Sequence, residues 1–495
     1  MVYGYRSGDR DQLFLLPPSM ADWLEESHLA WFVIDAVKLI DTSSFHDAHP
    51  DGPGRPAYDP EVLLGVLLYA YATGVRSSRA IMAACQSDLA FKVIAVNLVP
   101  DHRTIARFRA DNEAAIKSVF VEVLKICHAA GLASLGQIAI DGTKIGSDAA
   151  LDKNRDAAWI RAEIEKILGE AAAADAAEDA SPQLVDAALP EPLRHRDSRL
   201  ARLEAALRCV QAQERLAREQ DEEKWSRAEK EAAARRKLRG RKPKDPHAAL
   251  LRAEADLKAT RAKAAGAPRA DLSSELEAAE ARVEQARAEA AAAPVAKIVA
   301  NVTDAESRIL KTKDGWIQGY NVQAAVNADQ VVVAYAATQD HNDVGQLEPM
   351  IEATRAAADA AGISGPIGLV LADAGYWSEE NATTDGPDRL IATTKDWKQR
   401  RAARELGKTT GPPPPGATTL EQMEHRLRTT EGTAAYATRS YTVEPVFGDT
   451  KENRGFRRFM RRGLLAADSE AALIFAVHNL LKVFHHNPSV VFARS

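Results

Sequence analysis

Residues 1–135 carry apolar side chains at the three- and four-residue spacing of amphipathic helices. Pro60 opens an apolar helix, EVLLGVLLYAYATG, and Gly74 closes it, as expected for a proline in the first turn and a glycine past the end. A second run, SSRAIMAACQSDLAFKVIAV, follows with the same helical spacing. The pattern predicts a helical N-terminal domain.

The segment PDHRTIARFR, at 100–109, predicts one further helix, which Asp101 or Thr104 can cap. This helix carries Arg103 and Arg107. Short helices, a Pro-Asp turn and an arginine-bearing helix are typical of helix-turn-helix DNA-binding domains. A solvated arginine face on a structural helix is the alternative.

Residues 151–296 differ in character from the segments on either side. They are rich in Ala, Glu, Arg and Lys and nearly free of β-branched residues, a composition typical of long helices. Two helical stretches, about 197–237 and 247–291, flank RRKLRGRKPKDPH, in which a glycine and two prolines mark a turn. We expect an α-helical insertion, an antiparallel coiled-coil-like hairpin with a basic tip, and a surface loop at 171–192.

Strand patterns lie on both sides of this insertion. GQIAIDG predicts a buried strand within 136–150, and GYNVQAAV, QVVVAYAAT, PIGLVLAD and RLIATTK predict four more within 297–495. Asp343 and Gln346 imitate a capping box at the start of a helix that lies between the second and third of these four strands. Without the insertion the order is strand, strand, strand, helix, strand, helix, strand, helix. This order predicts a mixed α/β sheet that is interrupted after its first strand.

The chain has 495 residues and a formal net charge of −6, so a polyanion must be bound by local basic patches. The cysteines Cys85, Cys127 and Cys209 are far apart and form no CxxC pair. Their spacing argues against a zinc ribbon or a disulfide framework and fits a reducing cytosol. The apolar stretch at 62–75 is shorter than the roughly 20 residues that cross a bilayer. We expect a cytoplasmic protein without a membrane partner.

Two predicted strands end in the same way. IAID and LVLAD place Asp141 and Asp373 at the C-terminal ends of apolar runs, and a glycine follows each closely. Ligands of open α/β sheets bind in the crevice at such strand ends. Two carboxylates there repel unless a cation lies between them, and an oxygen-rich site without histidine favours Mg²⁺ or Mn²⁺. A lone aspartate at a strand end is otherwise a cap or turn residue.

Glu444 is the natural third carboxylate of a two-metal site. Proline is tolerated only in a first helical turn, so Pro445 predicts that Glu444 lies at the start of its helix. A basic run follows, and it can bind DNA phosphates without reading sequence. Its members are Lys451, Arg454, Arg457, Arg458, Arg461 and Arg462.

Taken together, these segments resemble the DDE transposases of bacterial insertion sequences, in the branch with a helical N-terminal transposase domain. RPAYDPEVLLGVLLYAYATGVRSSRAI and PDHRTIARFR are similar to the N-terminal domain. The catalytic part is represented by IAIDGTKI, DGWIQGYNVQAAV, QDHNDVGQLEPMI, LADAGYWSEEN and VEPVFGDTKENRGFRRFMRRG. The resemblance covers nearly the whole chain.

The resemblance implies an RNase H-like core in which Asp141, Asp373 and Glu444 are the DDE triad and bind two Mg²⁺ (or Mn²⁺) ions. One ion would help to ionise a water that attacks the phosphodiester at the end of the element, and the other would stabilise the leaving 3′ oxygen. The freed 3′-OH would then attack target DNA. The implied partners are double-stranded DNA, as terminal inverted repeats and as target, and a second protomer of a homodimer at the bacterial nucleoid.

The family also has a Tyr-x2-Arg-x3-Glu-x6-Lys signature, whose members help to grip the transposon end. Tyr436, Arg439, Glu444 and Lys451 align with it, although four residues rather than three separate the arginine from the glutamate. The cysteine cluster that some relatives carry before the glutamate is missing from this sequence.

The basic tip of the predicted helical hairpin is a further candidate for DNA contact. Its RGRKP sequence resembles a minor-groove hook, and a solvated basic turn is the alternative. The residues concerned are Arg239, Arg241 and Lys242. The long helices can also pair protomers.

Two other functions fit the same residues. One is a catalytically silent, transposase-derived DNA-binding regulator, and the other is an RNase H-like nuclease that cuts without strand transfer. Trp316, Trp377 and Trp397 are candidates to stack on an extruded base, with core packing as the alternative for each.

Overall fold

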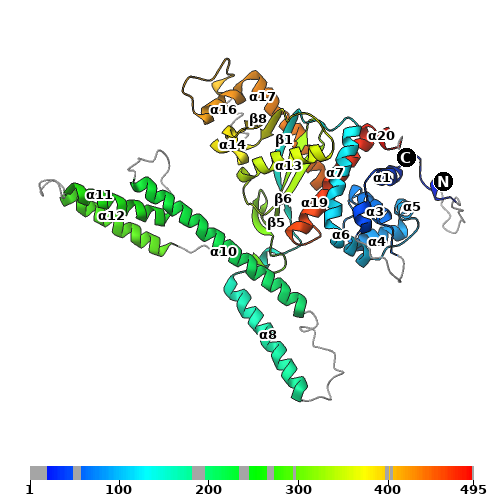
Figure 1. Cartoon of the computed structure of the whole chain (residues 1–495), viewed down its shortest axis with the longest axis horizontal. Helices are drawn as coiled ribbons and strands as arrows, with labels where there is room; N and C mark the ends of the chain where they lie inside the picture. Colours follow the sequence, from blue (N-terminus) through cyan, green and yellow to red (C-terminus); the bar gives the residue numbers. More distant parts are fainter. Residues whose placement is uncertain are drawn as a thin grey trace, which may run out of the picture. The chain divides into compact units, whose positions relative to one another are not determined.

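The computed structural model divides the chain into two compact units (Figure 1). One unit joins Met1–Leu151 to Ser307–Ser495, and the other is Asp152–Glu306. The second unit thus extends past residue 296, the predicted end of the insertion. The structure describes residues 19–47, 57–180, 196–233, 245–264, 273–293, 297–395, 398, 401 and 405–492.

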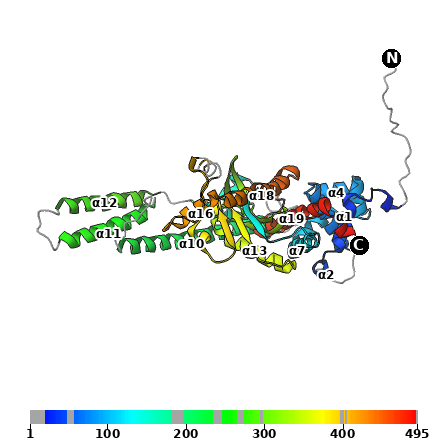
Figure 2. The ribbon, with the colours of Figure 1, turned by 90° about the horizontal axis from the view of Figure 1, so that it is seen from above.

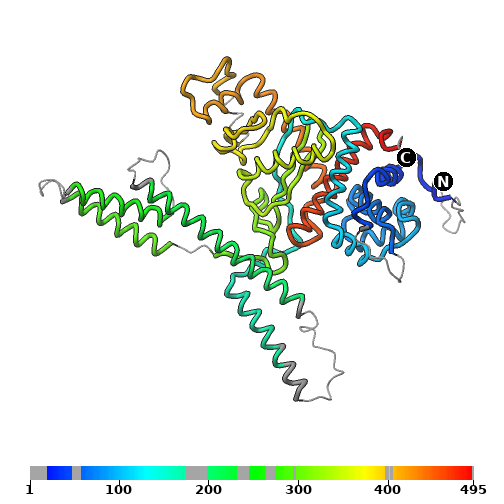
Figure 3. Tube along the Cα trace, in the orientation of Figure 1, coloured from blue at the N-terminus to red at the C-terminus, as the bar shows by residue number. Residues whose placement is uncertain are grey.

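The first unit contains a mixed six-stranded sheet. Its strands are β1 (Gln137–Gly146), β4 (Arg308–Thr312), β5 (Gly315–Asn327), β6 (Val332–Thr338), β7 (Leu369–Ala372) and β8 (Asp388–Ile391). The order is β4-β5-β1-β7-β8, and β6 also pairs with β5. β1, in cyan in Figure 3, is antiparallel to β5 and parallel to β7, although the whole second unit separates it from both in sequence. This mixed α/β sheet agrees with the prediction.

β4 was not predicted, although the sequence carries a signal for it. Lys313 and Asp314 form the turn between β4 and β5, and Gly315 begins β5. The Asp-Gly dipeptide that they share with β5 in the sequence favours a tight hairpin. The hairpin carries Trp316 at its tip, where 58% of the residue is exposed.

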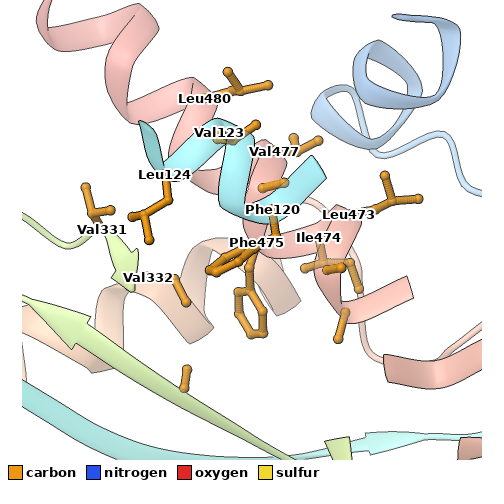
Figure 4. Packing of buried hydrophobic residues seen from close by; sticks show 14 of the residues in the cluster. Phe120, Val123, Leu124, Val331, Val332, Leu473, Ile474, Phe475, Val477 and Leu480 are labelled. Atoms are coloured by element: carbon orange, nitrogen blue, oxygen red, sulfur yellow. The ribbon is translucent and has the colours of Figure 1, made fainter. Parts of the chain in front are cut away.

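The helices before β1 share one hydrophobic core with the sheet and form no separate unit. The core helices are α1 (Leu29–Lys38), α2 (Ser43–Asp47), α3 (Pro60–Ala72), α4 (Ser78–Ser87), α5 (Leu89–Ile94), α6 (His102–Asp111), α7 (Glu113–Ala129), α19 (Leu464–His486) and α20 (Ser489–Phe492). α7 lies along α19, and both meet β6 (Figure 4). Tyr335 of β6 contacts Phe120 of α7 edge-on and also Phe475 of α19. The predicted N-terminal domain is therefore continuous with the sheet.

α19 is long and apolar enough to cross a membrane, and no other helix of the described residues is. However, 78% of its most apolar window is buried inside the protein, as in the core helix of a soluble protein. It also carries buried polar residues with partners. Asn479 bonds both backbone groups of Val332, and Glu470 accepts a hydrogen bond from Tyr71.

Shorter helices complete the first unit. They are α13 (Leu347–Ala360), α14 (Glu379–Thr383), α16 (Thr419–Arg428), α17 (Thr430–Ala437), α18 (Arg439–Gly448) and a π-helix (Asp449–Asn453) that continues α18. Residues 454–463 then run beside the end of β1, where Gly146 and Arg458 form a β-bridge.

The second unit is helical, as predicted, with a small core of its own. It contains α8 (Ala157–Ala180), α10 (Arg196–Ala233), α11 (Pro246–Ala264) and α12 (Ser273–Ala292), with a short pair of strands, β2 (Asn154–Arg155) and β3 (Ala300–Asn301). Ile160 of α8 packs with Leu203 and Ala206 of α10. α11 and α12 lie side by side (Figure 2), joined by two ion pairs, Arg261–Glu280 and Arg287–Glu254.

Two details of the helical prediction are wrong. The expected helix over 247–291 is two helices, since α11 ends at Ala264 and α12 begins at Ser273. The sequence between them contains a glycine and a proline, which disfavour a helix interior. The expected loop at 171–192 is helical as far as Ala180, because its alanine-rich first half favours helix.

Candidate active site

β1 and β7 bring the two predicted aspartates side by side. Their parallel ladder runs as far as the residues just before Asp141 and Asp373, so these two side chains occupy neighbouring positions. β7 stops here, whereas β1 continues to Gly146. The prediction that both aspartates lie at strand ends therefore holds for Asp373 alone.

Glu444 does not lie at the start of its helix, contrary to the prediction. It is in the middle of α18, and Pro445 is inside the same helix. A proline there has no N–H to donate to the Tyr441 carbonyl one turn earlier. The side-chain amide of Gln330, in the turn between β5 and β6, donates to that carbonyl instead, at 2.7 Å. This substitute bond explains why α18 tolerates the proline.

Arg439, five residues before Glu444 on α18, contacts all three carboxylates. Its Nη2 lies 2.6 Å from Asp141 Oδ2 and 4.0 Å from Asp373 Oδ2, and its Nη1 lies 3.6 Å from Glu444 Oε1. The guanidinium is buried. It therefore acts as the counter-ion of the acidic site, and its contact with DNA stays a prediction.

The acidic site disfavours ionisation of its most buried member. Burial raises the pKa of Asp141 to about 7, although the Arg439 charge opposes this change and the Asp373 charge adds to it. Burial and the charges of Asp141 and Asp343 raise the pKa of the nearby Tyr376 hydroxyl as well. Such perturbed groups around a charged cluster are typical of functional sites.

Asp343 is a fourth carboxylate of the site, and the sequence analysis missed it. It was expected to cap a helix, but it makes no side-chain capping bond there. Its Oδ1 accepts hydrogen bonds from Asn321 Nδ2 at 2.7 Å and Gln323 Nε2 at 2.8 Å. Both amides lie on one face of β5, two residues apart. Polar residues at alternate positions of an otherwise buried strand were the available signal.

The glycines after the two aspartates give this fourth carboxylate its room. A Cβ on Gly142 would stand 2.7 Å from Asp343 Oδ1. A Cβ on Gly375 would stand 3.0 Å from Asp373 Oδ1 and 3.2 Å from Asp343 Oδ2. The small residues in the two motifs thus permit the close approach of the acidic groups.

The basic run after Glu444 divides into buried and exposed members. Arg454 is buried, with its Nε 3.0 Å from Asp449 Oδ2 and its Nη1 donating to the Ile474 carbonyl. Its guanidinium also lies over the Phe456 ring. Arg454 therefore links the π-helix to α19, and its contact with DNA stays a prediction.

Arg457, Arg458 and Arg462 have side chains that are 62%, 54% and 45% exposed. The last two share the carboxylate of Asp148, and Arg457 pairs with Glu452. Surface pairs of this kind are weak, so these guanidinium groups remain accessible to a phosphate.

Lys451 and Arg461 are less accessible. Lys451 donates to the Lys144 carbonyl on β1 at 2.9 Å, and burial together with the charges of Arg457 and Lys313 lowers its pKa. Arg461 is largely buried in an ion pair with Glu113 of α7.

The remaining predicted residues lie in varied surroundings. Arg103 and Arg107 are exposed on α6, and Tyr436 is half-buried on α17. Trp316 is exposed, so the core-packing alternative is wrong for it, whereas Trp377 is half-buried against the core. The predicted residues that lie outside the described part of the chain are Trp397, Arg239, Arg241 and Lys242.

The acidic residues fit a hard divalent cation in their chemistry. The site offers carboxylate oxygens, without thiol or imidazole, which suits Mg²⁺ or Mn²⁺. Among the described residues, no group of three Asp, Glu, His or Cys side chains is close enough together to hold a metal ion. The Arg439 guanidinium, placed among the carboxylates, is a stand-in for a cation there. It would have to yield its position to an ion.

Two models of known protein families match parts of the chain. A family model described as transposase domain (DUF772) matches residues 19–111, which are the helical layer before β1. A second, described as transposase DDE domain, matches residues 414–484, which hold Arg439, Glu444 and the basic run. No curated protein and no solved structure gave a significant match.

Proposed function

We propose that the chain is a DDE transposase of the insertion-sequence type, which its two matches to transposase family models support, and that its acidic site cuts the DNA at the ends of a mobile element and joins those ends to target DNA. The convergence of Asp141, Asp373 and Glu444 on a single guanidinium carries the proposal. These three carboxylates would hold two Mg²⁺ or Mn²⁺ ions. When bound, the ions supply positive charge to the reacting phosphate oxygens.

The topology supports an RNase H-like core for this reaction. β6, β5 and β1 form an antiparallel series, and β7 and β8 extend it in parallel from β1. Asp141 lies on the central strand, and Asp373 follows the strand beside it. We infer that the helical second unit is an insertion into this core, which the break after β1 supports.

The exposed basic residues support binding of double-stranded DNA beside the carboxylates. Arg457, Arg458 and Arg462 lie on the segment that pairs with the end of β1, the strand of Asp141. Lys451 is fixed to the same strand through the Lys144 carbonyl. We infer that these side chains hold the phosphate backbone of the inverted repeats, and that a homodimer brings two ends together.

A catalytically silent DNA-binding regulator is the second candidate. The observation that favours it is the position of the Arg439 guanidinium, which competes with a cation for the carboxylates. A nuclease that cuts without joining would share the site and differ only in its products.

The test uses purified protein and a labelled duplex with the inverted repeats that flank the gene. The duplex is incubated with Mg²⁺, with Ca²⁺ and without metal, and Asp373→Asn and Glu444→Gln are run in parallel. We expect Mg²⁺-dependent cuts at the repeat boundary and joined products for the wild type only, with DNA binding retained by both variants. Specific binding without cleavage under any metal would favour the regulator, and cuts without joined products would favour the nuclease.

A further inference from the structure

Asp343, the fourth carboxylate of the acidic site, has one oxygen that accepts hydrogen bonds and one that accepts none from the described residues. Asp343 Oδ1 accepts both amide hydrogen bonds, from Asn321 and Gln323. No hydrogen bond from the described residues reaches Oδ2. This oxygen and Asp373 Oδ1 lie 3.2 Å and 3.0 Å from one point, the Cβ position that Gly375 leaves empty. Two carboxylates from different elements therefore face the same small space.

Hydrogen bonds fix which oxygen of Asp343 is free. The Tyr376 hydroxyl donates to Gln323 Oε1, which leaves the Gln323 amide nitrogen to face Asp343. Asn321 presents its amide nitrogen to the same oxygen. Ligating carboxylates are commonly held by such supporting hydrogen bonds, which orient the remaining oxygen.

Asn321 supplies an independent sign that a ligand belongs here. The residue is 1% exposed, and its Oδ1 has no hydrogen-bond partner among the described residues. This oxygen lies 3.2 Å from the Cβ position of Gly142, the residue that follows Asp141 on β1. Buried acceptors are rarely left without a donor. A water carried by a bound Mg²⁺ or Mn²⁺ would supply one, because these ions retain several waters.

We propose that Asp343 is a fourth acidic ligand of the divalent-cation site, acting beside Asp373, and that Asn321 and Gln323 position it. The inference rests on the proposed metal-dependent function. It assigns to the loop before α13 a role in cation binding that the three-residue triad does not include. The ligand class is a hard divalent cation with oxygen ligands.

The test measures Mn²⁺ binding to the full chain without DNA, by calorimetry and by the electron paramagnetic resonance signal of free Mn²⁺. Asp343→Asn keeps the acceptor for both amides and removes the ligating oxygen, and Asp343→Ser removes the carboxylate altogether. Asp340→Asn, an exposed aspartate in the same loop, is the matched control. Asp373→Asn reports on the triad.

We expect both Asp343 variants to lose one bound Mn²⁺ or to bind it at least tenfold more weakly, as Asp373→Asn should, while Asp340→Asn stays within twofold of the wild type. If either folded Asp343 variant binds Mn²⁺ with wild-type affinity and stoichiometry while Asp373→Asn loses Mn²⁺, this inference is overturned and the proposed metal dependence is not. Absence of Mn²⁺ binding by the wild type would overturn the inference together with the proposed metal dependence.

Discussion

Replacing Asp141 by asparagine should stabilise the metal-free protein at neutral pH while it abolishes cleavage. Burial raises the pKa of this carboxyl from 3.8 to about 7, even with the Arg439 charge opposing it. Since each pKa unit corresponds to about 1.4 kcal/mol, ionised Asp141 costs the folded state on the order of 4 kcal/mol. Asparagine keeps the shape and the acceptor oxygen, and it never ionises.

The pH dependence has a definite sign. The folded protein binds more protons than the unfolded chain between pH 3.8, the unfolded value, and about 7, the folded value. The wild type should therefore lose stability as pH rises through this window, and the loss is complete above it. Asp141→Asn should match the wild type near pH 4 and exceed it by roughly 4 kcal/mol at pH 8.

The assay is thermal and urea unfolding in EDTA at a series of pH values, with Asp359→Asn, an exposed aspartate on α13, as the control. Mg²⁺ added at pH 8 should raise the stability of the wild type and narrow its difference from Asp141→Asn, because a ligand that binds only the folded state stabilises it. A difference that stays constant from pH 4 to pH 8 would refute the assignment of the raised pKa to Asp141.

Four further predictions concern packing and DNA. Arg454→Gln should lower the free energy of unfolding by about 1–3 kcal/mol in urea unfolding, because the buried Ile474 carbonyl loses its donor. Arg457→Gln should leave stability unchanged and reduce the salt dependence of DNA binding by about one phosphate contact, measured by fluorescence anisotropy. Gln330→Ala should lower the free energy of unfolding by about 0.5–1.5 kcal/mol in urea unfolding, because the Tyr441 carbonyl loses the donor that replaces the missing N–H of Pro445. No loss would mean that water replaces this donor. Trp316→Ala should change stability by less than about 0.5 kcal/mol and weaken DNA binding by about 1–3 kcal/mol if the ring stacks on a base; unchanged binding would exclude that contact.

The positions of the two aspartates could be predicted from sequence because each follows an apolar strand pattern of its own. The pattern is local, and the parallel pairing of β1 with β7 then brings Asp141 and Asp373 together. Glu444 could also be nominated, since a carboxylate before a basic run is a local signal. The position of Glu444 in the middle of α18 could not be predicted. The hydrogen bond that compensates for the missing N–H of Pro445 comes from Gln330, which is remote in sequence.

The roles of the arginines were the least predictable part. A sequence shows that Arg439 and Arg454 are basic, but not whether a phosphate or a carboxylate faces them. The structure directs Arg439 at the acidic site and Arg454 at Asp449, both inside the protein. Asp343 was missed for a related reason, because an aspartate before a helix has a sufficient local explanation as a cap.

The position of Arg439 late in the chain has a consequence for biosynthesis. The ribosome completes β1, β7 and their two aspartates before it adds α18, which brings both the third carboxylate and the guanidinium that pairs with all three. A nascent chain that ends before α18 carries uncompensated negative charge at the centre of its sheet. It therefore lacks one of the three acidic groups and their shared counter-ion, so the acidic site becomes complete only when α18 has been synthesised.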